Sequence, residues 1–580
     1  MNIRKMTSYF KIYPIKKLNL VFLDWNYILF TFRLNLERYV LIMSKQSFLQ
    51  GAALLTFTMF LSKILGFIYV IPFTKLVGNQ GYILFEYAYK PYAIMLSLAT
   101  MGLPSAVSKF VSKYNALGDY ETGRRLFKSG IIILTATGVL FTAILYIGAP
   151  QIAEWYVGKE HTTGNSMEDV TYVIRMVCFA LLIVPPMALG RGFFQGFQKM
   201  SPTGISQVIE QLVRIIMILV VSIVVMHYGS GEMRTAVGWS SFAAFVGAIF
   251  SVLVLIYYWF KYKSEIIQPN NKQGLEKPTL WAMYKELILS SVPFVIVSLA
   301  IPIHQSIDIF SINPVLQGQG KTLAEAEYVN SIVSLVQKIA IIPIVFANAF
   351  ALTLVPSITR SFVEKNKQEL DAQITKTFEI ILFLTLPCFI FFWVFAKDTF
   401  GILLGTAQAE YGGQVTAAYS SYSIFLSFFL VTAAILQGIN KQKFAVGSLI
   451  AGCLVKLALS MPFIQMFSGS GTAYSSIIGF TVSIGLNFYV IKKHAQFNFL
   501  KLFKQVAYVL GLSIVTTLVL FLTKHGLITL LPSHMATYIH SLITVCIGGI
   551  VAAIVYLGIS YFTGLLGYYL GARFKRKSRA

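Results

Sequence analysis

The chain has 580 residues, of which 56% are hydrophobic and only 12% are charged, and its mean hydropathy is +0.70. Because soluble domains carry about 25% charged residues, this composition excludes a soluble globular protein and indicates an all-α, polytopic membrane protein. The formal net charge of +24 indicates basic cytoplasmic loops and contact with anionic lipids, and we predict no nucleic-acid partner. The four cysteines lie in apolar runs without a CxxC spacing, so neither a disulfide nor a metal site is predicted.

The first 42 residues are basic and aromatic and lack a small-residue cleavage site, which argues against a signal peptide. Residues 43–47, with the sequence MSKQS, form a polar start that leads directly into the first apolar stretch. We therefore expect translation to begin at Met43 and residues 1–42 to be a non-native extension. The alternative is an interfacial amphipathic helix.

Fourteen hydrophobic stretches follow, each long enough to cross a bilayer as a helix. In chain order the predicted spans lie near 48–73, 82–108, 127–149, 170–192, 203–227, 236–260, 286–310, 326–356, 376–396, 415–437, 443–467, 472–491, 503–523 and 540–570.

Lys and Arg alternate between the connections. Those after even-numbered spans are rich in both residues, from 109–128 after the second span to 573–579 after the last. Those after odd-numbered spans are poor in both, and the one at 150–169 is acidic. By the positive-inside rule the basic connections are cytoplasmic. An even number of spans puts both termini on one side, so both are predicted to be cytoplasmic.

Two sequence matches indicate an internal repeat. A Pro-Ser pair at 104–105 and at 356–357 is followed each time by Phe-Val and Lys at the same spacing, with an offset of 252 positions. A Gln-Gly pair at 195–196 and at 437–438, with an offset of 242, precedes a basic residue of the next span by nineteen positions in both copies. Each span therefore corresponds to the span six places later, in the same orientation.

The repeat predicts two tandem six-helix lobes followed by two further helices. The predicted domains are the extension 1–42, the first lobe 43–260, a cytoplasmic linker 261–285, the second lobe 286–492, helices 13 and 14 at 493–571 and a basic tail 572–580. Parallel repeats of this kind place a substrate site between the two halves, open alternately to each side.

Several ionisable residues fall inside the spans, where a charge costs roughly 2.5–3.5 kcal/mol on insertion scales and usually faces a partner or a wet cavity. Lys63, Lys338, Asp308 and His304 are the candidate substrate-binding residues, on spans 1, 8 and 7. Lysines attract an anionic headgroup such as a pyrophosphate as point charges, and the acid and the histidine would tune its release by protonation or ion binding.

The other interior charges are candidates for structural ion pairs or for the cavity wall. Glu86 and Lys90 are four residues apart and on one helical face, and Glu210 and Arg214 repeat this spacing, so each pair is predicted to form an ion pair. Lys456 is a further candidate in the eleventh span.

The residues resemble a known family. Residues 62–67, Ser-Lys-Ile-Leu-Gly-Phe, are similar to a Ser-Arg-x-Leu-Gly-Phe motif in the first helix of the MurJ-type lipid II flippases, so Lys63 stands where these proteins carry a functional arginine. Lys338, five positions before Pro343, resembles an arginine of their eighth helix, and Asp308 falls where the seventh helix often has an aspartate. The resemblance covers 44–570 and is closest to the SpoVB/YtgP-like Firmicute branch of the multidrug/oligosaccharidyl-lipid/polysaccharide exporter superfamily. In one departure, Tyr69 stands where Gram-negative members carry a second arginine.

The resemblance implies a flippase in the bacterial plasma membrane that moves undecaprenyl-pyrophosphate-linked peptidoglycan precursor to the outer leaflet. It implies a central cavity between the lobes, a groove for the lipid tail along helices 13 and 14, and no cofactor or enzymatic step. Sodium, protons or the membrane potential would drive transport, and the cell-wall synthesis or division machinery is a candidate partner. The alternatives are a flippase for another lipid-linked oligosaccharide, such as a capsule, teichoic-acid or exopolysaccharide unit, a drug/cation antiporter, and a membrane glycan enzyme.

Overall fold

The computed structural model describes residues 48–100, 102–116, 118–159, 163–267, 279–405, 408–497, 500–532 and 537–570. All regular secondary structure in these ranges is helical, which confirms the predicted all-α class. The predicted extension 1–42, the expected start at Met43 and the basic tail 572–580 lie outside the described residues, as does the middle of the predicted linker.

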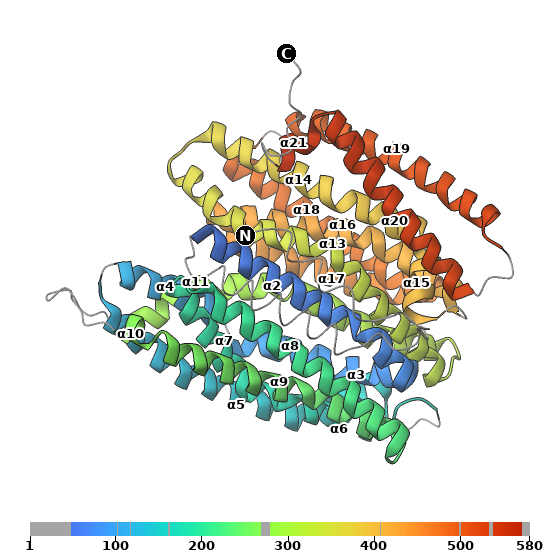
Figure 1. The fold of residues 1–580 in the computed structure, drawn as a ribbon, viewed down its shortest axis with the longest axis horizontal. Helices are drawn as coiled ribbons and strands as arrows, with labels where there is room; N and C mark the ends of the chain where they lie inside the picture. The colour runs from blue at the N-terminus through green and yellow to red at the C-terminus, as the bar shows by residue number, and fades with distance from the viewer. Residues whose placement is uncertain are drawn as a thin grey trace, which may run out of the picture.

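The helices of the first half form the lower part of the molecule in Figure 1. They are α2 (Phe48–Ile68), α3 (Val70–Thr100), α4 (Leu103–Ala116), α5 (Tyr120–Val157), α6 (Met167–Cys178), α7 (Ala180–Gly196), α8 (Met200–Ile223), the π-helical turn η2 (Val224–Tyr228), α9 (Met233–Lys261) and α10 (Lys263–Ile266).

Most helices of the second half lie above them, but its first helix lies beside α4. The helices of this half are α11 (Leu280–Ser298), α12 (Ala300–Gly318), α13 (Leu323–Val363), α14 (Lys367–Val394), α15 (Ala396–Leu404), α16 (Ala409–Gly438), α17 (Gln442–Phe467), α18 (Gly469–Ala495), α19 (Leu500–Leu530), α20 (Thr537–Phe562) and α21 (Leu565–Leu570).

The element α3 contains the turn between the first two predicted spans. Gly78 has φ +69°, a conformation that favours glycine. As one straight helix, residues 48–100 would be roughly 80 Å long at 1.5 Å per residue, far more than the ~30 Å of a bilayer core. The chain therefore changes direction at Gly78, between the stretches that the sequence predicted as spans 1 and 2.

Among the described residues, eleven helices are long and apolar enough to cross a membrane, or twelve if residues 60–68 and α3 form one span bent by 43°. A multi-pass membrane protein is confirmed, but the predicted count of fourteen is not. The predicted spans 1 and 7 are interrupted at Tyr69 and Leu299, and the predicted span 2 is divided between α3, which ends at Thr100, and α4, which begins at Leu103. Such breaks shorten the uninterrupted apolar stretch.

The apolar cores follow the two halves of the chain. One large core cluster is built from α11 to α18 and their connections, and two others are built mainly from residues of α3 to α9. Met283 and Tyr284, near the start of α11, pack into a first-half core, and the Tyr284 hydroxyl lies 2.9 Å from the Ser129 hydroxyl of α5. Helices α19 and α20 pack on α14 and α15 through separate apolar clusters.

The structure contains the repeat that the Gln-Gly matches indicated. The connections α7–α8 and α16–α17 are the same turn, with φ 58° at both Gln198 and Asn440, which are 242 positions apart. In each turn the next residue's N–H donates to a carbonyl five positions earlier, Lys199 to Phe194 at 3.0 Å and Lys441 to Leu436 at 2.7 Å.

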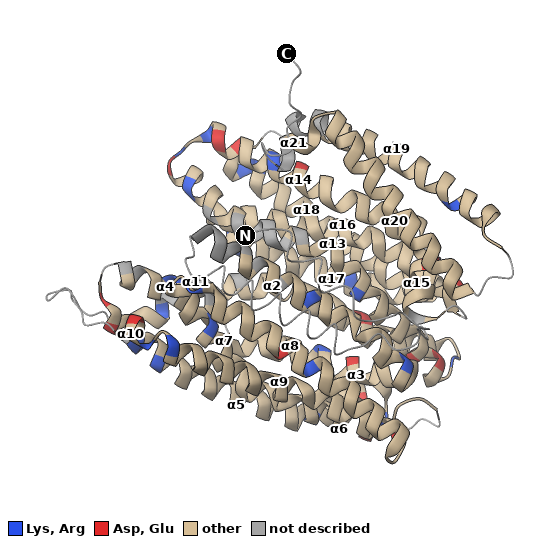
Figure 2. Ribbon diagram, viewed as in Figure 1, with Lys and Arg blue, Asp and Glu red and all other residues tan. Residues whose placement is uncertain are grey.

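Lys and Arg residues concentrate at one end of the helix bundle, at the left of Figure 2. We call this the basic end; it carries the connections α4–α5, α9–α10 and α13–α14, with Arg124, Arg125, Lys261, Lys263, Arg360 and Lys365 among its residues. The connections α5–α6 and α12–α13 lie at the opposite end. That the basic end faces the cytoplasm stays a prediction.

Candidate functional site

The centre of the candidate site is the carboxylate of Glu86 on α3, which is fully buried. It accepts from Lys90, one turn further along α3, at 3.0 Å, and from Lys338 on α13 at 2.9 Å. The Tyr82 hydroxyl donates a third hydrogen bond at 3.1 Å. The predicted Glu86–Lys90 pair is present, and the same carboxylate also holds Lys338 across the boundary between the two halves.

Glu86 and Lys338 occupy equivalent positions of the internal repeat. They are 252 positions apart, which is the offset between the two Pro-Ser pairs, and Pro91 and Pro343 share this offset. When two parallel repeats are related by an axis along the membrane normal, equivalent residues near the axis face each other. The two equivalent positions carry opposite charges here, so they form an ion pair between the lobes. The repeat could have predicted this pair.

Neutral amides extend this network into the second half. The Lys90 ammonium donates to Gln305 of α12 at 2.8 Å and lies 3.5 Å from the side-chain oxygen of Gln337 of α13. The Gln337 amide nitrogen donates in turn to Asp308 at 2.8 Å. Sequence reasoning missed both glutamines because they carry no charge; their positions inside apolar spans were the available signal.

Asp308 on α12 forms a second buried ion pair, with Lys456 on α17 at 2.6 Å. The Lys456 ammonium, which is fully buried, also donates to the Ser476 hydroxyl at 2.6 Å and to the His304 carbonyl at 2.7 Å. The Tyr419 hydroxyl donates to Asp308 at 3.1 Å. Asp308 is therefore neutralised within the second half in this structure.

His304 shares a face of α12 with Asp308, as predicted, but its ring makes a different contact. The imidazole stacks on Phe480, with ring centroids 4.0 Å apart, and neither ring nitrogen has a hydrogen-bond partner among the described residues. The structure thus places His304 beside the Asp308–Lys456 pair without bonding the ring to it.

The predicted pair between Glu210 and Arg214 is wrong. Glu210 of α8 accepts from Arg191 of α7 at 2.6 Å, because the Arg191 side chain fills the space between α7, α8 and α9 and also donates to Ser251 at 2.8 Å. The Arg214 guanidinium instead lies over the ring of Tyr89, 5.0 Å from its centroid, and donates to the Tyr89 hydroxyl at 3.4 Å.

Lys63 is not part of the network. Its side chain is exposed, and it forms no ion pair with any described residue. Thr58, Ser62 and Gly66 form the face of α2 that packs on α8, and the Ser62 hydroxyl donates to the Gln207 carbonyl at 3.4 Å. Lys63 projects from beside this face.

The charges at the boundary between the halves do not balance. Lys90 and Lys338 share the single carboxylate of Glu86, and a third cation, Arg214, forms no ion pair with any described carboxylate. The ammonium of Lys338 and the guanidinium of Arg214 both lie over Tyr89, 5.6 and 5.0 Å from its ring centroid. Among the described residues no group of His, Cys, Asp and Glu could hold a metal ion. This cluster, which we call the central cluster, is a site with excess positive charge in a buried setting, and it suits an anion.

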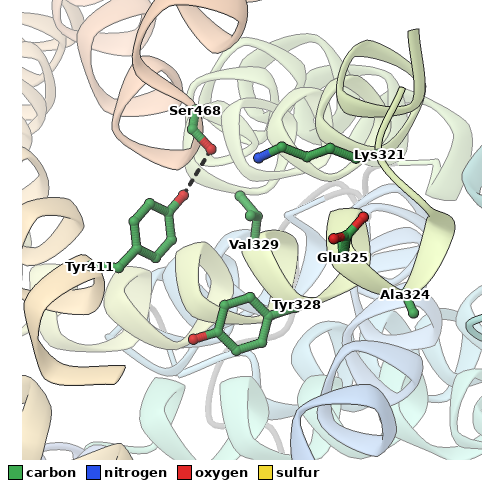
Figure 3. A pocket seen from close by; sticks show the side chains of 7 residues that line it. All are labelled: Lys321, Ala324, Glu325, Tyr328, Val329, Tyr411 and Ser468. Atoms are coloured by element: carbon green, nitrogen blue, oxygen red, sulfur yellow. Dashed lines mark hydrogen bonds between the residues drawn. The ribbon is translucent and has the colours of Figure 1, made fainter. Parts of the chain in front are cut away.

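A separate hollow of about 450 Å³ lies at the end opposite the basic end. Figure 3 shows Lys321, Tyr328, Tyr411 and Ser468 around it, with the Tyr411 hydroxyl 2.9 Å from that of Ser468. None of the predicted site residues lines it.

Comparisons with known proteins connect this geometry to a family. A family model described as polysaccharide biosynthesis protein matches residues 48–362. The Bacillus subtilis (strain 168) protein named Lipid II flippase MurJ is 39% identical over 540 residues, which cover 92% of this chain and 98% of that protein. The chain belongs to the MurJ family. Stage V sporulation protein B of the same organism is 25% identical over 430 residues, 72% of this chain and 78% of that protein.

Solved structures show the same fold for this MurJ-family chain. A structure of lipid II flippase MurJ in an inward closed conformation superposes with a TM-score of 0.61 at 14% identity, over 88% of this chain and 99% of that one. An inward-facing multidrug resistance MATE family transporter of the MOP superfamily gives a TM-score of 0.58 at 14% identity, over 75% and 94%. The predicted resemblance to the MurJ family is confirmed.

Proposed function

We propose that the protein is a lipid II flippase, which carries the undecaprenyl-pyrophosphate-linked peptidoglycan precursor from the inner to the outer leaflet by alternating access. The 39% identity to a protein named as a lipid II flippase and the shared fold support this function. The structural observation that carries it is the central cluster at the boundary between the halves, where two lysines share one carboxylate and Arg214 adds a third positive charge over Tyr89. A pyrophosphate headgroup cannot cross hydrocarbon unaided, since each unpaired polar group costs several kcal/mol there.

The two cations above Tyr89 are the proposed headgroup ligands. The Lys338 side chain is 23% exposed, whereas that of Lys90 is 3% exposed, so Lys338 is the more accessible of the two lysines on Glu86. Arg214 adds a planar guanidinium, which suits phosphate oxygens. A bound pyrophosphate would compete with Glu86 for Lys338, so loading the site would weaken the bond between the halves.

The remaining predicted ligands act at a greater distance. The exposed ammonium of Lys63 would meet the headgroup before it reaches the central cluster. Asp308 and His304 would act indirectly, because Asp308 connects to Lys90 only through Gln337, and His304 contributes its carbonyl to Lys456.

The lipid tail would stay in hydrocarbon along α19 and α20, which expose large apolar side chains such as Leu518, Leu522, Ile550 and Ile554. We place the protein in the plasma membrane with its basic end and both termini in the cytoplasm, where anionic lipids would bind that end. Sodium, protons or the membrane potential would drive transport without a bound cofactor, and the cell-wall synthesis or division machinery is the proposed protein partner.

The substrate is tested by depleting this protein in cells that have no other lipid II flippase and measuring lipid II in the outer leaflet. We expect the outer pool to disappear, the inner pool to grow and re-expression to restore both. A persistent outer pool with loss of a capsule or teichoic polymer would overturn lipid II as the substrate and support a flippase for another lipid-linked oligosaccharide.

The same cells test the site. We expect Arg214→Gln and Lys338→Ala to abolish rescue at normal membrane abundance, since each removes a cation from the central cluster. The matched control is Arg175→Gln. Arg175 also lies over a tyrosine, 4.8 Å from the ring of Tyr146, but it lines a separate pocket that contains no residue of the central cluster, so its loss should leave rescue intact. Equal rescue by all three variants would remove Arg214 and Lys338 from the site.

A further inference from the structure

A short loop of the first half contacts α13 at the end opposite the basic end. In the α5–α6 connection, the Asn165 N–H donates to one Glu327 carboxylate oxygen at 2.9 Å, and the Asn165 side-chain amide donates to the other at 3.0 Å. Both residues are 1% exposed. Among the described residues no cation forms an ion pair with Glu327, so this buried carboxylate depends on donors from the other half of the molecule. We call this contact the clasp.

The approach of the loop to α13 is close. Gly164 has φ +86°, and a Cβ atom there would lie 2.9 Å from a Glu327 carboxylate oxygen and 2.8 Å from a Leu323 side-chain carbon. A larger residue would therefore push the loop away. The Asn165 amide also donates to the Gln80 carbonyl at 3.1 Å, which fixes its orientation within the first half.

A second layer of contacts between the halves lies behind the clasp. The Asn313 amide of α12 donates to the Tyr87 hydroxyl of α3 at 2.5 Å and to the Tyr156 carbonyl of α5 at 2.8 Å. The Tyr156 ring stacks on Phe310, with centroids 4.4 Å apart. Asn313 is fully buried, so solvent does not reach it in this conformation.

These layers and the central cluster follow one face of α13. Glu327, Ser334 and Lys338 are separated by seven and four residues, a spacing that places them on one side of a helix. Moving inward along this face, one passes from the clasp to the fully buried Ser334 and then to the Glu86–Lys338 pair. The contacts are mostly polar, so water can replace them when the halves separate, whereas the apolar cores within each half have no such replacement.

We propose that the clasp between Asn165 and Glu327, supported by Asn313 and Tyr87, is the gate that closes the central cluster to the end opposite the basic end. The gate opens when the two halves separate at that end, and Glu327 then exchanges the Asn165 donors for water. This proposal rests on the alternating-access part of the proposed function and not on the identity of the cargo.

The gate is tested by the accessibility of Ser334, which lies between the clasp and the central cluster. In a background with all four cysteines replaced by alanine, Ser334→Cys provides the reporter, and a membrane-impermeant maleimide is added to intact cells. We expect Asn165→Ala and Glu327→Gln each to raise the labelling rate at least about tenfold, the factor expected for losing a hydrogen bond to a charged group. The matched control is Glu325→Gln, on the same turn of α13 but exposed, which should leave the rate unchanged.

A cross-link closes the same gate. The double variant Asn165→Cys with Glu327→Cys should form a disulfide on oxidation, suppress labelling of the reporter and stop transport, and reduction should restore both. Unchanged labelling in Asn165→Ala and Glu327→Gln, or continued transport by the cross-linked protein, would overturn the gate. If lipid II were the wrong cargo, the labelling results would be unaffected, so the two proposals fail separately.

Discussion

At the scale of single residues, the Glu86 carboxylate is the shared counter-charge of two lysines, Lys90 and Lys338. Glu86→Gln keeps the size of the side chain but leaves Lys90 and Lys338 without their shared counter-charge. We expect a loss of about 3–5 kcal/mol in the free energy of unfolding, because removing one partner of a buried ion pair leaves an uncompensated charge. The measurement is the thermal unfolding midpoint of the purified protein in detergent.

The control for this prediction is Glu364→Gln, which removes the carboxylate of another pair with four-residue spacing. The Arg360–Glu364 distance is 2.9 Å, as short as the buried contacts, but both side chains are exposed and water screens the pair. Its unfolding midpoint should equal that of the unmodified protein. Equal midpoints for the two variants would show that the Glu86 carboxylate stabilises nothing.

The charged residues of the candidate site could be found from the sequence, but their partners could not. A charge inside an apolar span is visible by itself, which is how Glu86, Lys338, Asp308 and Lys456 were identified. Partners depend on which helices pack together. Glu210 therefore pairs with Arg191 and not with Arg214, and Asp308 pairs with Lys456. The spacing of these residues in the sequence indicates neither pair.

At the scale of helices, close packing between α17 and α18 depends on small residues. A Cβ atom at Gly452 would lie 2.5 Å from the Gly479 carbonyl oxygen, and backbone atoms cannot move aside as a flexible side chain can. We expect Gly452→Ala to destabilise the protein by about 1–3 kcal/mol, the usual cost of overpacking. The control on the same helix is Gly447→Ala, where a Cβ atom meets nothing within 4 Å.

The thermal unfolding midpoints of these two alanine variants test whether the close contact between Gly452 and Gly479 contributes to stability. Gly447→Ala should match or slightly exceed the stability of the unmodified protein, since alanine favours the helix more than glycine does. If Gly452→Ala behaved the same way, α17 and α18 would have room to separate, and the close approach would not contribute to stability.

The positions of the helices could largely be predicted from the hydropathy of the sequence, but the breaks within the predicted spans could not. Apolar length located the spans, and the offset of 242 between two Gln-Gly pairs anticipated the identical turns at Gln198 and Asn440. The interruptions at Tyr69 and Leu299 lie inside apolar runs, so a hydropathy profile does not detect them. Each break is followed three residues later by a proline, Pro72 or Pro302, which cannot donate to the carbonyl four positions earlier, at the last residue of the preceding helix. These prolines are the local signal that the hydropathy pattern did not use.

At the scale of the whole molecule, the orientation in the membrane follows from the separation of charge in Figure 2. Positive connections are retained in the cytoplasm, so the basic end should lie inside and the hollow shown in Figure 3 outside. Two exposed positions report on this, Glu364 in the α13–α14 connection and Lys321 in the α12–α13 connection. Because a single helix, α13, joins the two connections, they must lie on opposite sides of the membrane.

In the background with no native cysteine, Lys321→Cys should react with a membrane-impermeant maleimide in intact cells, and Glu364→Cys should react only after the cells are opened. Both side chains are exposed, so burial cannot explain a difference between them. The reverse pattern would place the basic end outside, and the gate formed by Asn165 and Glu327 would then face the cytoplasm. The clasp would then control entry of the cargo from the cytoplasm, and release would take place at the basic end.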